Sequence, residues 1–222
     1  MGGWWRFAVV GFGQGRVPVR GGRVGTAKHT VGWTPHAGPQ TRFLASGVRS
    51  GLYGGAAGGG KTDALIYGGL QQIHIPGYRA LFVRRTFPEL REVMDRTHAM
   101  FSRMGARWVA SDKRWVFPSG ALYEFGYAES YRDVLQFQGQ EFQYIAVDEI
   151  GLWPERRMWD FLDTRCRTTN PNVRSFMRCS ANPGGPGHGW VKAHWVDVCV
   201  PDGTPFIDPR SGLSRAYVHA RV

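Results

Sequence analysis

A glycine-rich segment, Gly54 to Thr62, contains the residues with the clearest chemical potential. From Gly55 the sequence reads G-x-x-x-x-G-K-T, the pattern of a phosphate-binding loop. Glycines let successive backbone N–H groups turn toward phosphate oxygens without a clash from Cβ. In this interpretation Lys61 reaches the β- and γ-phosphates and the Thr62 hydroxyl holds Mg²⁺. The cradle itself consists of Gly55, Ala56, Ala57, Gly58, Gly59 and Gly60. Because the chain has 31 glycines, a flexible linker that happens to precede Lys-Thr is the alternative for this segment taken alone.

The acid pair Asp148-Glu149 is the second candidate group, and it directly follows the apolar run 144–147. Such a run predicts a fully buried parallel strand, and open α/β sheets bind their ligands at the carboxyl ends of strands. We expect Asp148 to bind Mg²⁺ through water and Glu149 to polarise an attacking water as general base. Two adjacent acids can also form a solvated turn. Their place downstream of a phosphate loop favours hydrolysis of the nucleotide by water over transfer of its phosphoryl group to another acceptor.

Polar residues at two other places complete the candidate site. Ser180 and Asn182 follow the predicted strand 173–179, where they could contact the γ-phosphate or its water and pass hydrolysis on to the next loop. The alternative is a Gly/Pro turn in which Asn182 caps a helix. Gln40 precedes the loop, and its amide could pair with both hydrogen-bonding edges of adenine. The alternative for Gln40 is a polar residue at a helix start.

Strands and helices alternate from about residue 33, which predicts an α/β fold with a mostly parallel sheet and helices on both faces. We expect strands at 48–53, 80–83, 143–147 and 173–179. A hairpin is expected between 113–117 and 121–125, across the turn Pro118-Ser119-Gly120. We expect helices at 41–46, about 61–74, 87–104, 130–137 and 154–166.

Length and composition exclude several classes of protein. The 222 residues suit one large domain, and the apolar content of 42% is enough for a substantial core. No apolar run approaches about 18 residues, so we expect no membrane span. The first residues lack the long apolar stretch of a signal peptide, so we do not expect secretion. Three cysteines without C-x-x-C spacing predict reduced, buried thiols in a cytoplasmic compartment.

The net charge of +11 is concentrated toward the N-terminus, since residues 1–62 contain eight Lys or Arg and no Asp or Glu. A polycation attracts nucleic acid through counterion release. The excess of arginine over lysine can also reflect a GC-rich genome. We expect residues 1–32 to form a basic Gly/Arg-rich arm that is disordered, unless the true start lies further in, and residues 33–222 to form one domain.

In the order of these segments, the chain resembles the ATPase domain of the large terminase subunit of tailed bacteriophages. The resemblance covers about residues 33–220. It rests on Pro39-Gln40, on 52–62, on F-V-R-R-T-F at 82–87, on 138–142, on S-A-N-P at 180–183 and on H-G-W at 188–190. Each piece is modestly specific, and their order and spacing together are highly specific. The resemblance implies a P-loop NTPase fold of the RecA/ASCE-like type.

The same resemblance implies a function. It implies a motor that uses ATP and Mg²⁺ to drive double-stranded DNA into an empty procapsid. Such subunits form a homo-oligomeric, typically pentameric ring on the portal protein, in the host cytoplasm, and a small terminase subunit helps choose the DNA. By position, the resemblance implies that Gln40 contacts adenine, that Asp148 and Glu149 act as described above, and that Ser180 and Asn182 form the coupling motif.

The chain departs from the family pattern at the arginine that neutralises charge on the phosphates. Some members have it directly before the glycine at position 139, where this chain has Gln138, and others have it inside the loop, at Ala56 or Ala57. An arginine supplied in trans can be worth about 10³–10⁵ in rate. The candidates are Arg84, Arg85 and Arg132, and the alternative for each is a surface or DNA-facing charge.

A second departure concerns the RNase H-like nuclease domain into which large terminases continue. That domain needs a cluster of metal-binding acids, and only scattered acids follow Glu149 before Val222. We therefore expect no nuclease activity from these residues. Two other functions are weighed against the motor. One is another DNA-dependent P-loop ATPase or helicase-like protein, for which a second RecA-like domain would be expected. The other is a truncated, non-catalytic fragment that binds DNA or the capsid.

Overall fold

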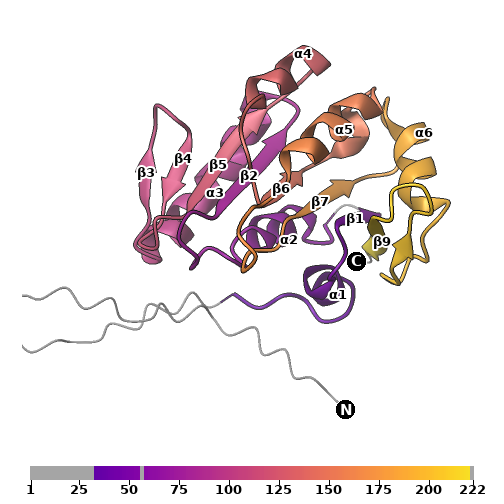
Figure 1. The fold of residues 1–222 in the computed structure, drawn as a ribbon, viewed down its shortest axis with the longest axis horizontal. Coiled ribbons are helices and arrows are strands. Elements are labelled where there is room, and N and C mark those ends of the chain that lie inside the picture. The colour runs from indigo at the N-terminus through magenta and orange to yellow at the C-terminus, as the bar shows by residue number, and fades with distance from the viewer. Residues whose placement is uncertain (1–32, 56–57, 221–222) are drawn as a thin grey trace, which may run out of the picture.

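The computed structural model describes residues 33–55 and 58–220 (Figure 1). The predicted basic arm, residues 1–32, lies outside the described residues, as do Ala56 and Ala57 of the predicted cradle. No helix in the described part of the chain combines the length and apolar character needed to cross a membrane.

A nine-stranded sheet forms the centre of the described residues, in the order β3-β4-β5-β2-β6-β7-β1-β9-β8. Six neighbouring strands run parallel: β5 (Leu122–Tyr127), β2 (Arg79–Arg84), β6 (Tyr144–Val147), β7 (Phe176–Ala181), β1 (Ser50–Gly55) and β9 (Ser214–Ala220). Antiparallel strands close both edges: β3 (Arg107–Val109) and β4 (Arg114–Val116) on one side, β8 (Phe206–Ile207) on the other. The predicted mostly parallel sheet and the hairpin between β4 and β5 are confirmed.

Helices cover both faces of this sheet, as predicted. α1 (Pro39–Ala45), α2 (Lys61–Gly68) and α3 (Phe87–Arg103) contribute to one apolar cluster, and α4 (Tyr131–Val134), α5 (Arg156–Arg165) and α6 (His188–Val191) contribute to another. Figure 1 shows α4, α5 and α6 across the sheet from α1 and α2. The strand β6 explains the two layers, because side chains alternate along a strand. Tyr144 and Ala146 join the first cluster, whereas Ile145 and Val147 join the second.

Most element boundaries differ little from the predicted ones, and α3 shows why it could be predicted. Thr86 and Glu89 form a capping box at its start, its buried residues recur at helical spacing, and Gly105 follows its end with a φ of 77°. Predicted strand 173–179 begins later and continues to Ala181, so Ser180 lies inside β7. Short 3₁₀ segments at Leu135–Phe137 and Ile150–Leu152 and a π-helical turn at Lys192–Val196 complete the described elements.

The helix predicted at about 61–74 was too long, because α2 ends at Gly68. A Cβ on Gly68 would lie 2.6 Å from the Tyr144 hydroxyl oxygen, and one on Gly69 would lie 2.5 Å from the Tyr123 ring. These phenols reach into the space beside the last turn and donate hydrogen bonds to its carbonyls. The chain therefore leaves the helix through a series of turns before β2.

The prediction of buried thiols is confirmed for the described residues. Cys166, Cys179 and Cys199 are buried and form no disulfide. Burial raises the pKa of the Cys166 thiol to about 11, and Arg49 nearby acts in the opposite direction. These cysteines are therefore weakly nucleophilic core residues.

Candidate functional site

The carboxyl ends of four neighbouring strands meet at one edge of the sheet. β7 lies between β1 and β6, and β2 lies on the far side of β6. The parallel registers pair Gly54 with Ala181, and Val147 with both Cys179 and Val83. This order places the glycine-rich loop, Ser180, the acid pair and Arg84 along a single edge, where open α/β sheets bind ligands.

The described part of the glycine-rich loop has the backbone conformation that only glycine adopts easily. Gly55, Gly58 and Gly60 have φ angles of 131°, 84° and 63°. A Cβ on Gly55 would lie 2.5 Å from the Ala220 carbonyl oxygen, so the loop leaves β1 through a space that admits no side chain. The glycine pattern in the sequence therefore reflects a folded turn in these residues and not a flexible linker.

Lys61 begins α2 and points back along the loop, where its Nζ donates a hydrogen bond to the Gly55 carbonyl at 3.2 Å. Partial burial lowers the pKa of Lys61, while Asp148 and Glu149 act in the opposite direction. The ammonium therefore lies in the combined field of both acids, at the start of the helix.

Asp148 is the centre of the constellation, and its side chain is only 1% exposed. Its Oδ2 accepts a hydrogen bond from the Thr62 hydroxyl at 2.9 Å, and its Oδ1 accepts one from the Ser180 hydroxyl at 2.5 Å. The Arg84 guanidinium donates to Oδ2 from Nε at 2.9 Å and forms an ion pair through Nη2 at 2.8 Å. The buried carboxylate is thus surrounded by donors, which is what a buried charge requires.

Thr62 and Asp148, the two predicted Mg²⁺ ligands, are in direct contact through their oxygen atoms. Magnesium prefers oxygen ligands and is usually held by one or two carboxylates together with waters and substrate phosphates. One carboxylate and one hydroxyl at the head of a phosphate loop fit this preference. The donor set is therefore compatible with Mg²⁺, although the described residues contain no cluster of three or more His, Cys, Asp or Glu.

Glu149 has an unusual backbone, with φ 57° and ψ 44° in the left-handed region. For a residue other than glycine this conformation is uncommon and is typical of functional sites. The Glu149 backbone N–H donates to the Ser180 hydroxyl at 2.9 Å, so Ser180 contacts both acids at once. This hydrogen bond holds the peptide between Asp148 and Glu149 against β7.

The Glu149 carboxylate is 35% exposed and lies 3.8 Å from Nη2 of Arg84. Burial raises the pKa of Glu149, Arg84 lowers it, and Asp148 raises it further. A carboxylate with a raised pKa is a better proton acceptor at neutral pH. A cavity of about 110 Å³ lies beside it, lined by Glu149, Asn182 and neighbouring loop residues.

Of the three candidate arginines, Arg84 is the one that forms ion pairs with the acids. Within the described residues, no ion pair joins Arg85 or Arg132 to Asp148 or Glu149. Arg85 is half-buried, and its Nε has no hydrogen-bond partner among the described residues. Arg132 is exposed on α4. Of the three candidate arginines, the structure therefore brings Arg84 to the acid pair.

Gln40 is 1% exposed and lies directly against the loop. Its Nε2 donates to the Gly60 carbonyl at 2.9 Å, and its Oε1 accepts from the His36 backbone N–H at 2.6 Å. In this structure the amide therefore holds the loop at Gly60. Its contact with adenine stays a prediction.

Asn182 is exposed where the chain leaves β7 and enters the glycine-rich turn 184–187. That turn packs on the short 3₁₀ segment that follows Glu149. The Gly187 N–H donates to the Gly151 carbonyl at 2.8 Å, and a Cβ on Gly187 would lie 2.1 Å from the Trp153 carbonyl oxygen. A displacement of Glu149 would therefore be transmitted directly to the turn after Asn182.

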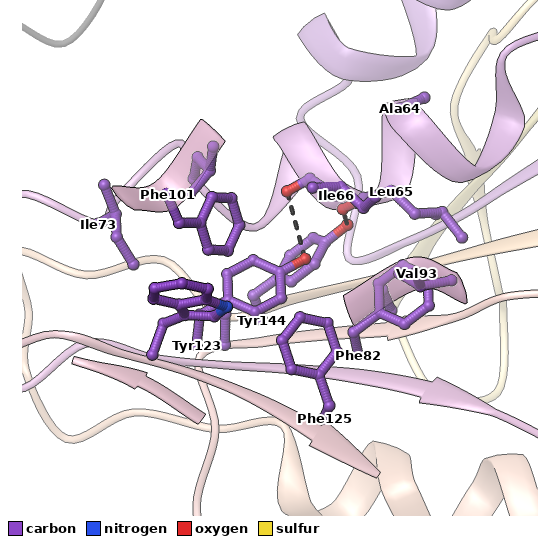
Figure 2. Packing of buried hydrophobic residues seen from close by; sticks show 14 of the residues in the cluster. Ala64, Leu65, Ile66, Ile73, Phe82, Val93, Phe101, Tyr123, Phe125 and Tyr144 are labelled. Atoms are coloured by element: carbon purple, nitrogen blue, oxygen red, sulfur yellow. Dashed lines mark hydrogen bonds between the residues drawn. The ribbon is translucent and has the colours of Figure 1, made fainter. Parts of the chain in front are cut away.

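The structure also shows contacts that the sequence analysis missed. Tyr144 and Tyr123 donate hydrogen bonds to the Leu65 and Ile66 carbonyls of α2 (Figure 2). In the sequence these tyrosines have the same pattern as any apolar residue of a buried strand. No sequence signal distinguishes them from ordinary core residues.

Comparison with known proteins gives no match among family models or curated proteins. Solved structures do match. The large terminase from a thermophilic bacteriophage has a TM-score of 0.61 and 16% identity, and the match covers 82% of this chain and 44% of that one. The Thermus phage P74-26 large terminase ATPase domain, as a mutant, has a TM-score of 0.61 and 14% identity, covering 85% and 82%.

The N-terminal domain of the DNA packaging ATPase from bacteriophage phi29 also matches, with a TM-score of 0.52, 15% identity and coverage of 77% of this chain and 90% of that one. The thermophilic phage terminase was also solved in complex with ADP and with ATP-γ-S. This chain spans less than half of that terminase but most of the two isolated domains. At these identities the likeness shows the fold alone, and it confirms the predicted α/β fold with a mostly parallel sheet and helices on both faces.

Proposed function

We propose that this chain is the ATP-hydrolysing motor domain of a phage terminase large subunit, which drives double-stranded DNA into a procapsid. The observation that supports this function best is the arrangement around Asp148. One carboxylate contacts the Thr62 hydroxyl, the Ser180 hydroxyl and the half-buried Arg84, beside a second acid in a strained backbone. The fold shared with phage packaging ATPases supports the same function.

Each residue would then have a defined task in hydrolysis. The loop N–H groups and Lys61 hold the β- and γ-phosphates. Thr62 and Asp148 hold Mg²⁺, which neutralises charge on the phosphates when it is bound. Glu149 accepts the proton of the attacking water, favoured by its raised pKa. Arg84 keeps both acids in place from within the same subunit.

Ser180 would connect hydrolysis to movement. Its hydroxyl contacts the Asp148 carboxylate and the Glu149 backbone, and its strand leads into Asn182 and the turn that packs on the segment after Glu149. A change in the acid pair on phosphate release would reach that turn through these contacts. Asn182, beside the cavity next to Glu149, would sense the water or the γ-phosphate.

The wider assembly follows from the same proposal. We infer a homo-oligomeric ring on the portal protein in the host cytoplasm, with a small terminase subunit as partner and ATP and Mg²⁺ as cofactors. The basic residues 1–32 would contact DNA, since the net charge of +11 is concentrated toward the N-terminus. We attribute no nuclease activity to these residues.

Phosphate release by the purified 222-residue chain, with and without double-stranded DNA, tests the proposal. We expect slow turnover that rises with DNA or on addition of procapsids. Glu149→Gln should bind ATP without cleaving it, and Lys61→Ala should lose nucleotide affinity. Glu92→Gln is the matched control, because Glu92 is exposed on α3, and it should behave as wild type.

Four results would contradict the motor. Normal hydrolysis by Glu149→Gln would remove the general base from the mechanism, and unchanged nucleotide affinity in Lys61→Ala would remove the phosphate site. DNA or capsid binding without any turnover would favour a non-catalytic fragment. Strand separation of a duplex by the isolated chain would favour a helicase-like protein.

A further inference from the structure

Two buried phenols clamp the helix that carries the phosphate-loop residues. The Tyr144 hydroxyl donates to the Leu65 carbonyl at 2.7 Å, and the Tyr123 hydroxyl donates to the Ile66 carbonyl at 3.3 Å (Figure 2). Both tyrosines are fully buried, and this burial raises the pKa of each phenol. The hydroxyls therefore stay protonated and act as donors.

Glycines at the end of α2 and directly after it make room for these phenols. A Cβ on Gly68 would lie 2.6 Å from the Tyr144 hydroxyl oxygen, and a Cβ on Gly69 would lie 2.5 Å from the Tyr123 ring. Any side chain at either position would push a phenol away from the helix. The end of α2 and the two tyrosines therefore form one close-packed unit, in which small displacements are transmitted.

Tyr144 differs from Tyr123 in the strand on which it lies. Tyr144 is on β6, and Asp148 is the residue directly after the end of that strand. β6 and the residue that follows it therefore hold α2 at two points. Tyr144 contacts the second half of the helix at Leu65, and Asp148 contacts its first turn at Thr62. Tyr123 lies on β5, which contributes no residue to the candidate site.

We propose that Tyr144 is a positioning residue for ATP hydrolysis, acting by fixing α2 against β6. Its hydroxyl sets the distance between Thr62, at the head of the helix, and the acids that follow the strand. The proposal rests on the proposed function of the same site. It adds that the metal-binding geometry depends on a hydrogen bond to the Leu65 carbonyl, about one helical turn from the start of α2, made by a residue that touches no ligand.

Tyr144→Phe removes the hydroxyl and keeps the ring, and Tyr123→Phe makes the same change on the neighbouring strand. Misplacement of reacting groups by about 1 Å can cost about 10²-fold in rate. We therefore expect Tyr144→Phe to lower kcat about tenfold or more and to raise the Mg²⁺ concentration for half-maximal activity. Tyr123→Phe should stay within about twofold of wild type in both. A role in stability alone would affect the two variants alike.

Affinity for ATP-γ-S, measured with and without Mg²⁺, gives a readout that does not require turnover. Tyr144→Phe should keep the affinity measured without Mg²⁺, because Lys61 and the loop are unchanged, and should lose most of the gain that Mg²⁺ provides. Tyr123→Phe should keep that gain.

The role of Tyr144 would be overturned if Mg²⁺ increased the affinity for ATP-γ-S equally in both variants, or if both variants lost that increase equally. If wild type binds Mg²⁺ with nucleotide but hydrolyses nothing, the proposed function fails, and the affinity measurement still decides the role of Tyr144. If wild type binds no nucleotide, both proposals are refuted.

Discussion

Replacement of Arg84 by glutamine should destabilise the protein even when no nucleotide is bound. Arg84 is 12% exposed and makes two close contacts to the Asp148 carboxylate, at 2.9 and 2.8 Å, with a weaker one to Glu149 at 3.8 Å. Burial lowers the pKa of the guanidinium, but Asp148, Glu149 and Glu89 together outweigh this effect, so the pKa is raised. The folded state therefore depends on this charge being present.

The loss of stability expected for Arg84→Gln depends on the hydrogen-bond donors that Asp148 retains. Removing one partner of a buried ion pair costs about 3–5 kcal/mol, because the other charge remains buried. Asp148 retains the hydroxyl donors of Thr62 and Ser180, so we expect a loss of about 3 kcal/mol, at the lower end of this range. Arg84→Lys should lose less stability than Arg84→Gln but more than none, since one ammonium cannot reproduce both nitrogen contacts.

Urea unfolding of the nucleotide-free chain measures this loss directly. Arg96→Gln is the matched control, because Arg96 is 50% exposed and pairs with Glu92 one turn away on α3. It should cost no more than about 0.5 kcal/mol. If Arg84→Gln and Arg96→Gln lose the same free energy of unfolding, the buried ion pair contributes no more than an exposed one, and our account of the site is wrong.

Four further outcomes are expected. Hydrolysis should increase with pH through a midpoint above the usual Glu value of 4.5, because burial raises the pKa of Glu149; a midpoint at or below 4.5 would mean that another group titrates. The raised pKa also means that Glu149 favours folding below about pH 4.5, and this contribution is lost as the pH rises past its folded pKa. Gly187→Ala should cost about 1–3 kcal/mol in thermal unfolding, because its Cβ would meet the Trp153 carbonyl, whereas Gly189→Ala, with nothing within 4 Å, should be neutral or stabilising. The three thiols should react with a thiol reagent only after denaturation, and fast labelling of the native protein would show that their burial is not maintained.

Local sequence patterns were enough for much of the site. The glycine spacing before Lys61 predicts a turn that only glycine accommodates, and the φ angles of Gly55 and Gly60 explain why. The apolar run before Asp148 predicts a buried strand whose end carries the acids. These features depend on neighbours in the sequence, so the sequence alone contains them.

Contacts between distant segments could not be predicted from local sequence patterns. Arg84, Arg85 and Arg132 are equivalent as residue types, and only the pairing of β2 with β6 brings Arg84 to Asp148. α2 ends at Gly68 beside phenols from strands far along the chain. The local sequence pattern typical of a helix continues past Gly68, so the sequence alone predicted a helix that was too long.

The sequence by itself determined which residues have the chemistry of a phosphate and water site, because those types and spacings are local. Tertiary structure alone decided their partners. The insertion of β7 between β1 and β6 puts Ser180 against both acids, and the pairing of β2 with β6 brings Arg84 to the same two carboxylates. Strand order and packing arise from the whole chain, since burial is gained only when segments distant in sequence meet.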